Sequence, residues 1–95
     1  MIAHLEFQIA PGTYTLNAVG LRLSNKGIVT WYLDASVTPL GTMDWYLNGT
    51  DGIVKQIAGI VIPSSANNSH TLRGVVTKNV SSTGYLVAMG EMWLK

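Results

Sequence analysis

Apolar and polar residues alternate along most of this chain, and this period of two limits the folds available to it more than any other feature. Leu5, Phe7 and Ile9 alternate with polar neighbours, and the segment 13–18 repeats the pattern. Successive side chains of a β-strand point to opposite faces, so the pattern predicts half-buried strands rather than helices. By the same reasoning, we expect further strands at 28–34, 42–47, 53–62, 70–78 and 85–94.

Turn-forming residues separate these segments at intervals of about 8–12 residues. Pro11-Gly12 and the polar run 24–27 predict turns, and Asn48-Gly49 is the strongest hairpin signal. Gly59 predicts a bulge within its strand, and the side chains of the loop 79–84 are suited to hydrogen-bonding their own backbone. The sequence therefore predicts one all-β domain over residues 1–95, an antiparallel β-sandwich or jelly roll of seven to nine short strands.

The low charge of the chain excludes several classes of protein. Charged residues make up 12% of the sequence and the formal net charge is +1, whereas soluble domains contain about 25% charged residues. This balance excludes electrostatic binding to nucleic acid. No segment approaches the roughly 18 consecutive apolar residues of a membrane span, so we expect no membrane insertion. A weakly charged surface also favours self-association.

The residue types that carry catalysis or hold metals show no recognisable spacing. The chain has no cysteine, and neither His4 nor His70 has a partner at ligand spacing, so no metal or other cofactor is expected. The carboxylates are Glu6, Asp34, Asp44, Asp51 and Glu91. No spacing pairs any two of them as acid and base, and the serines lack a G-x-S-x-G elbow. We therefore expect that the protein is not an enzyme. Instead, Asp34 and Asp44 lie at strand ends, where carboxylates can accept hydrogen bonds from loop N–H groups.

Aromatic residues are the best functional candidates. In the strand 28–34, Trp31 and Tyr32 lie on opposite faces, each among further apolar residues. The last strand has the same two-sided character, and one small sandwich cannot cover both faces of both strands, so a neighbouring subunit is expected. Structural or interface roles are therefore assigned to Trp31, Tyr32, Leu72, Tyr85 and Trp93. If a glycan is bound, the predicted contacts are Trp45, Tyr46 and Asn48 near the Asn48-Gly49 turn, where rings and loop polar groups meet.

Four segments in one order and spacing carry a resemblance to a known family. They are Gly27–Asp34, Leu40–Tyr46, His70–Arg73 and Lys78–Tyr85, and the run 11–16 fits the same pattern. Over roughly residues 11–94, the chain resembles a β-sandwich module of bacteriophage virion proteins such as tail fibres, tailspikes and head appendages. The fold of that module is similar to galactose-binding-like and carbohydrate-binding jelly rolls. The shared positions are mostly scaffold positions, so the resemblance implies no particular sugar-binding or metal-binding residue.

The resemblance and the two-sided strands together predict a non-enzymatic phage structural protein. It would be a small virion component, either a capsid decoration or cement protein or part of a tail appendage, that assembles with itself and attaches to capsid or tail proteins. A homotrimer is favoured because appendages of the resembling family are built on threefold axes. No secretory leader follows Met1, so we expect synthesis in the host cytoplasm and a final location in the virion. The alternative is a carbohydrate-binding module or receptor-binding protein that recognises a cell-surface glycan.

Overall fold

The computed structural model describes the backbone of residues 2–95 and the side chains of residues 4–95. Within these residues the chain forms seven strands and one short 3-10 turn, η1 (Ala66–Asn68). The strands are β1 (Ile2–Gln8), β2 (Gly12–Leu23), β3 (Ile28–Leu33), β4 (Gly41–Asp44), β5 (Thr50–Ile62), β6 (Ser69–Thr77) and β7 (Met89–Leu94). Every pairing between these strands is antiparallel, so the predicted all-β antiparallel sandwich is confirmed. None of the described residues forms a helix that is long and apolar enough to cross a membrane.

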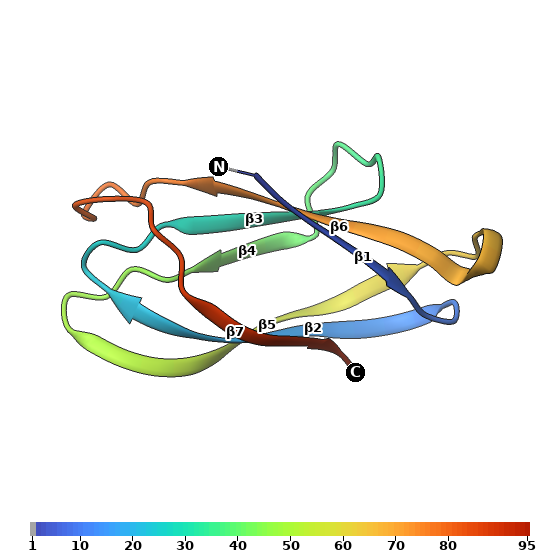
Figure 1. Ribbon diagram of the computed structural model, residues 1–95, viewed down its shortest axis with the longest axis horizontal. Coiled ribbons are helices and arrows are strands. Elements are labelled where there is room, and N and C mark those ends of the chain that lie inside the picture. The colour runs from blue at the N-terminus through green and yellow to red at the C-terminus, as the bar shows by residue number, and fades with distance from the viewer. Residues whose placement is uncertain (1) are drawn as a thin grey trace.

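Two sheets pack face to face around one core (Figure 1). The first sheet has the strand order β1-β6-β3-β4, and the second has the order β5-β2-β7. The chain passes from one sheet to the other at every connection except the one between β3 and β4. Strands β1 and β4 are therefore the edges of the first sheet, and β5 and β7 are the edges of the second. The jelly-roll form of the sandwich stays a prediction.

Two tryptophans fill the core, and each packs against a glycine of a neighbouring strand. Trp31 of β3 and Trp45, which follows β4, are both fully buried. A Cβ atom at Gly74 would lie 2.7 Å from the Trp31 ring, and one at Gly20 would lie 2.6 Å from the Trp45 ring. Such distances are shorter than any packed carbon contact. Glycine at these two positions therefore allows the backbones of β6 and β2 to approach the rings.

The predicted bulge at Gly59 is present in β5. The register between β2 and β5 shifts between Tyr14 and Leu16, where Ala58 and Gly59 together oppose a single residue of β2. Gly59 has φ = +71°, in the left-handed region that glycine adopts without strain. The bulge interrupts the edge of the second sheet at this point.

The loop 79–84 is held by its own side chains, as predicted. The Ser82 hydroxyl donates to the Gly84 carbonyl at 2.7 Å, and the Ser81 N–H donates to Asn79 Oδ1 at 2.9 Å. The Asn79 amide also donates to Asp44 Oδ2 at 2.7 Å, which fastens the loop to the end of β4. These bonds replace the strand pairing that the loop lacks.

Three local predictions are wrong. Asn48-Gly49 does not close a hairpin, because β4 and β5 belong to different sheets. Strand β4 ends at Asp44 rather than at residue 47, because the Asp44 carboxylate accepts the Tyr46 N–H at 3.0 Å and turns the chain. The last strand begins at Met89 rather than at residue 85. The preceding segment hydrogen-bonds to the β2–β3 connection instead, with Leu86 N–H donating to the Asn25 carbonyl at 3.1 Å.

Candidate functional site

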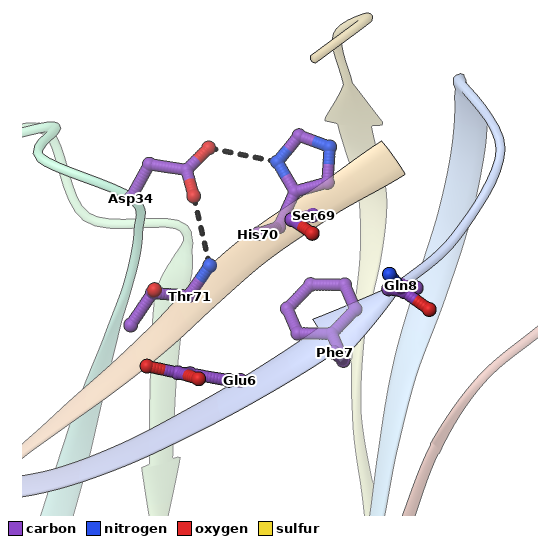
Figure 2. A pocket seen from close by; sticks show the side chains of 7 residues that line it. All are labelled: Glu6, Phe7, Gln8, Asp34, Ser69, His70 and Thr71. Atoms are coloured by element: carbon purple, nitrogen blue, oxygen red, sulfur yellow. Dashed lines mark hydrogen bonds and ion pairs between the residues drawn. The ribbon is translucent and has the colours of Figure 1, made fainter. Parts of the chain in front are cut away.

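A polar network joins the end of β3 to the start of β6 (Figure 2). Asp34 follows β3 with φ = +52°, and its Oδ2 lies 2.8 Å from Nδ1 of His70. Its other oxygen, Oδ1, accepts the backbone N–H of Thr71 at 2.8 Å. The Asp34 N–H in turn donates to the Thr71 carbonyl at 2.7 Å. The carboxylate therefore bridges the two strands, and its backbone donor is an N–H of strand β6 rather than the loop N–H that was predicted.

The network continues from His70 to a serine in the loop that precedes β6. Nε2 of His70 lies 3.2 Å from Oγ of Ser65, and the hydroxyl of Ser65 donates to the Ser69 carbonyl at 2.7 Å. The imidazole is buried, with 4% of the residue exposed. Ser65, His70 and Asp34 thus stand in the order of a hydrolase triad, an arrangement that the sequence did not suggest.

Two acceptors lie within reach of the Ser65 hydroxyl, which carries one proton. The Ser69 carbonyl is 2.7 Å from Oγ and His70 Nε2 is 3.2 Å from it, so the carbonyl competes with the histidine for that proton. A nucleophilic serine must instead donate that proton to the histidine that acts as its base. In this geometry the three side chains fasten the loop before β6 to the end of β3, and the shorter of the two Ser65 contacts is to a backbone carbonyl.

The carboxylates at the two ends of the sandwich have lowered pKa values. Burial alone would raise the pKa of Asp34, but the hydrogen bonds from His70 and from the Thr71 N–H outweigh it and lower the pKa. The pKa of Asp51 is lowered by the hydrogen bonds from Arg22, whose own pKa is raised by the same contact. Arg22 lies opposite Asp51 in the β2–β5 register, with 2.9 Å between Nε and Oδ1. Both carboxylates therefore stay ionised to lower pH than free ones.

A pocket of about 570 Å³ lies beside the network. Its lining residues are Glu6, Phe7, Gln8, Asp34, Ser69, His70 and Thr71. The β1–β6 register places Glu6 opposite Thr71, so both point to the outer face of the first sheet. Phe7 and His70 lie opposite each other on the inner face, with ring centroids 5.8 Å apart. The outer side of the pocket is therefore polar, and the aromatic ring belongs to the side of the core.

Metal binding finds no support in this part of the molecule. Among the described residues, no group of three or more His, Asp or Glu side chains is placed to hold a metal ion. His4 and His70 lie on opposite faces of neighbouring strands, since His4 pairs with Arg73 rather than with His70. The two histidines therefore do not form a joint site.

The structure separates the three residues predicted to contact a glycan. Trp45 is fully buried in the core, so the prediction that its ring is exposed for stacking is wrong. Burial follows from its place after β4, where the ring packs over Gly20 of the second sheet. Tyr46 is half-buried and Asn48 is exposed in the β4–β5 connection. Without the tryptophan, these two residues form no aromatic platform.

The residues predicted to be structural fall into two groups. Trp31 and Leu72 lie in the core. Tyr32 is half-buried on the outer face of the first sheet, where the Arg73 guanidinium lies 4.7 Å from its ring centroid. Tyr85 is 54% exposed, because the segment before β7 runs outside both sheets. It lies at the surface rather than in the core, and its interface role stays a prediction.

The outer face of the second sheet carries an apolar patch, which we define as Val19, Leu21, Val54 and Trp93. All four side chains are exposed, and Val19 lies directly opposite Val54 in the β2–β5 register. Trp93 of β7 lies opposite Asn17 of β2 on the same face and is 38% exposed. The sequence placed Trp93 at an interface, and its location on this patch fits that prediction.

Comparison of the chain with protein-family models, with curated proteins and with solved structures finds no match. The structure itself contributes two features to a functional proposal: the Asp34–His70–Ser65 network and the apolar patch.

Proposed function

We propose that this protein is a non-enzymatic structural component of a phage particle, which acts by assembling with itself and by attaching to other virion proteins. The observation that carries the proposal is the apolar patch on the outer face of the second sheet. The virion as its setting comes from the resemblance over residues 11–94 alone. The trimer that the resemblance implies stays a prediction.

The apolar patch supports attachment because its residues gain from being covered. A sheet that faces water on one side normally alternates apolar and polar residues between its faces. Here Val19, Leu21 and Val54 break that rule on the water side, and Trp93 adds a large ring beside them. Each square ångström of apolar surface removed from water contributes about 25 cal/mol. A partner protein that covers this face therefore gains affinity without any specific charge contact.

Incorporation into particles tests the attachment. Particles purified from the strain that encodes the chain should contain the wild-type protein, detected by mass spectrometry. Val19→Lys and Val54→Lys place a charge in the apolar patch and should abolish incorporation. Val37→Lys is the matched control, because Val37 is 87% exposed in the loop after β3, outside the patch. Incorporation of the Val19→Lys protein at the wild-type level would refute the patch as the attachment surface.

The non-enzymatic part of the proposal is supported by the contacts of the Ser65 hydroxyl. The Ser69 carbonyl, at 2.7 Å, lies closer to this hydroxyl than His70 Nε2 does, at 3.2 Å, and it draws the proton away from the base that a nucleophilic serine needs. We expect p-nitrophenyl acetate hydrolysis by the wild-type protein to equal that of Ser65→Ala. Turnover that Ser65→Ala or His70→Ala abolishes, in variants that remain folded by circular dichroism, would overturn this part.

Glycan binding is the second function to test, although Trp45 of the predicted contact set is buried and Tyr46 is half-buried. The assembled protein on a glycan array gives the answer directly. Binding that Tyr46→Ala and Asn48→Ala remove would establish the alternative function at the β4–β5 connection. Binding that both variants retain would place a glycan site elsewhere on the molecule.

A further inference from the structure

Strand β1 is a free edge with a defined set of unpaired backbone groups. The Ile9 N–H donates to the Asn68 carbonyl at 3.0 Å, in the same register that pairs Leu5 with Leu72. In an antiparallel pair, the N–H and C=O groups of alternate residues point to the same neighbour. Odd-numbered residues of β1 therefore bond to β6, and the N–H and C=O groups of His4, Glu6 and Gln8 point away from the sheet.

The other three edges are less suited to pairing with another strand. Strand β4 is only four residues long. Strand β5 carries the bulge at Gly59 and a lysine, Lys55, both of which protect edges in natural sheets. Strand β7 pairs with β2 through a register shift between Ala18 and Gly20. Strand β1 has no bulge, proline, glycine or lysine, and its pairing with β6 has no register shift.

We infer that β1 pairs antiparallel with β1 of a second copy of this chain, around a two-fold axis at Leu5. In this register His4 of each copy lies opposite Glu6 of the other, and Leu5 lies opposite Leu5. The pair of His4 and Glu6 is the one whose backbone groups are free, so the two residues exchange both N–H···O=C bonds. The side chains are complementary as well, because an imidazole N–H can donate to a carboxylate.

The inner face of the same strand supports the same partner. Leu5 points toward the core side, opposite the buried Leu72, yet it is 43% exposed because none of the described strands lies beyond β1. It lines an apolar groove of about 260 Å³ between β1 and β7, together with residues such as Leu16 and Met92. A second β1 strand places its own Leu5 beside this groove. One register therefore satisfies the backbone, the polar side chains and the apolar side chains together.

This contact deepens the self-assembly part of the proposed function and rests on it. It uses the edge of the first sheet and not the apolar patch, so the two surfaces can be tested separately. The contact is isologous, because the same residues meet on both sides of the axis. On its own it closes after two copies and yields a dimer rather than a trimer.

A charge exchange within β1 tests the register. Light scattering of the wild-type protein at tens of micromolar should give about 20 kDa, twice the 10.2 kDa of one chain. His4→Glu puts a carboxylate opposite Glu6 at both symmetric positions and should weaken the dimer about tenfold or more. The double variant H4E/E6K places opposite charges at the two positions in the same register and should recover the dimer. The control Thr42→Glu adds one charge to β4, the opposite edge of the same sheet, and should leave the mass unchanged.

Each outcome decides between the alternatives. A monomer or a trimer of the wild-type protein overturns the inference, and so does an H4E/E6K protein that dissociates as readily as His4→Glu. The double variant is also informative if the His4→Glu protein unfolds. Recovery of both the fold and the dimer by H4E/E6K still requires that positions 4 and 6 face each other across the contact. If Val19→Lys dissociates the protein and His4→Glu does not, the apolar patch is the self-association surface and the β1 contact is refuted. If Val19→Lys blocks incorporation into particles but leaves the dimer intact, both proposals stand.

Discussion

Replacing Gly74 with alanine tests the packing of the core at its tightest point. The new Cβ would lie 2.7 Å from Cζ3 of Trp31 and 3.0 Å from two further ring atoms, where carbon contacts normally settle at about 3.5–4.0 Å. The ring must therefore move by roughly 1 Å inside a close-packed core, and overpacking of this kind costs about 1–3 kcal/mol. Alanine also restricts the unfolded chain, which returns about 0.4–1 kcal/mol. We expect a net loss of about 1–2 kcal/mol in the free energy of unfolding.

Urea unfolding followed by tryptophan fluorescence measures this loss. Gly52→Ala is the matched control, because a Cβ at this strand position meets nothing closer than 3.8 Å. Trp31→Phe removes the ring edge that the alanine would strike, and also an indole N–H that has no hydrogen-bond partner among the described residues. The double variant of Gly74→Ala and Trp31→Phe should therefore lose less than the sum of the two single variants, by about 0.5 kcal/mol or more. Equal stability of the Gly74 and Gly52 variants, or strict additivity in the cycle, would refute the steric argument.

Three further predictions follow from the burial and the ion pairs. The folded pKa values of Asp34 and Asp51 are lowered, so the stability they contribute is present above about pH 3.9 and is lost as the pH falls through the lower folded values. The urea midpoint of Asp51→Asn should therefore fall less on acidification than that of the wild type. An identical fall in the two proteins would contradict the ion pair. Trp31→Ala should lower the free energy of unfolding by about 3–5 kcal/mol, so an unchanged melting temperature would show that the ring is not buried. Trp93→Phe should remove most of the acrylamide-quenchable fluorescence, since Trp93 is 38% exposed and the other two tryptophans are buried; quenching that persists in this variant would place another tryptophan at the surface.

Local features of the fold could be predicted from the sequence, whereas the assignment of strands to sheets could not. The period of two identifies strands because it depends only on the alternation of side chains within one segment. The Gly59 bulge and the loop 79–84 are local in the same sense. The Asn48-Gly49 dipeptide is also a local signal, but whether it closes a hairpin depends on where β5 finds its partner. That partner is β2, which comes much earlier in the chain.

The candidate site depends on long-range pairing throughout. Asp34 and His70 are 36 residues apart, and only the β3–β6 register brings their side chains together. No spacing rule in the sequence could connect them, although the position of Asp34 at a strand end did indicate a hydrogen-bonding role. For Trp45 the sequence predicted a contact that the structure does not allow, because a tryptophan beside a turn suggests an exposed ring. The glycine that accommodates its ring, Gly20, lies on a strand of the other sheet.

The β1 edge and the apolar patch belong to different sheets, and this separation determines what an assembled form can do. A two-fold axis between antiparallel strands runs perpendicular to their sheet, so both copies keep their second sheet on the same side of the joined first sheets. The two patches, each containing Val19, Val54 and Trp93, then face outward in the same direction. A dimer bound to a particle through one patch holds its second patch at high effective concentration near the same surface. Weak contact at each patch is therefore enough for stable attachment, and His4→Glu should reduce incorporation into particles even though it leaves the patch unchanged.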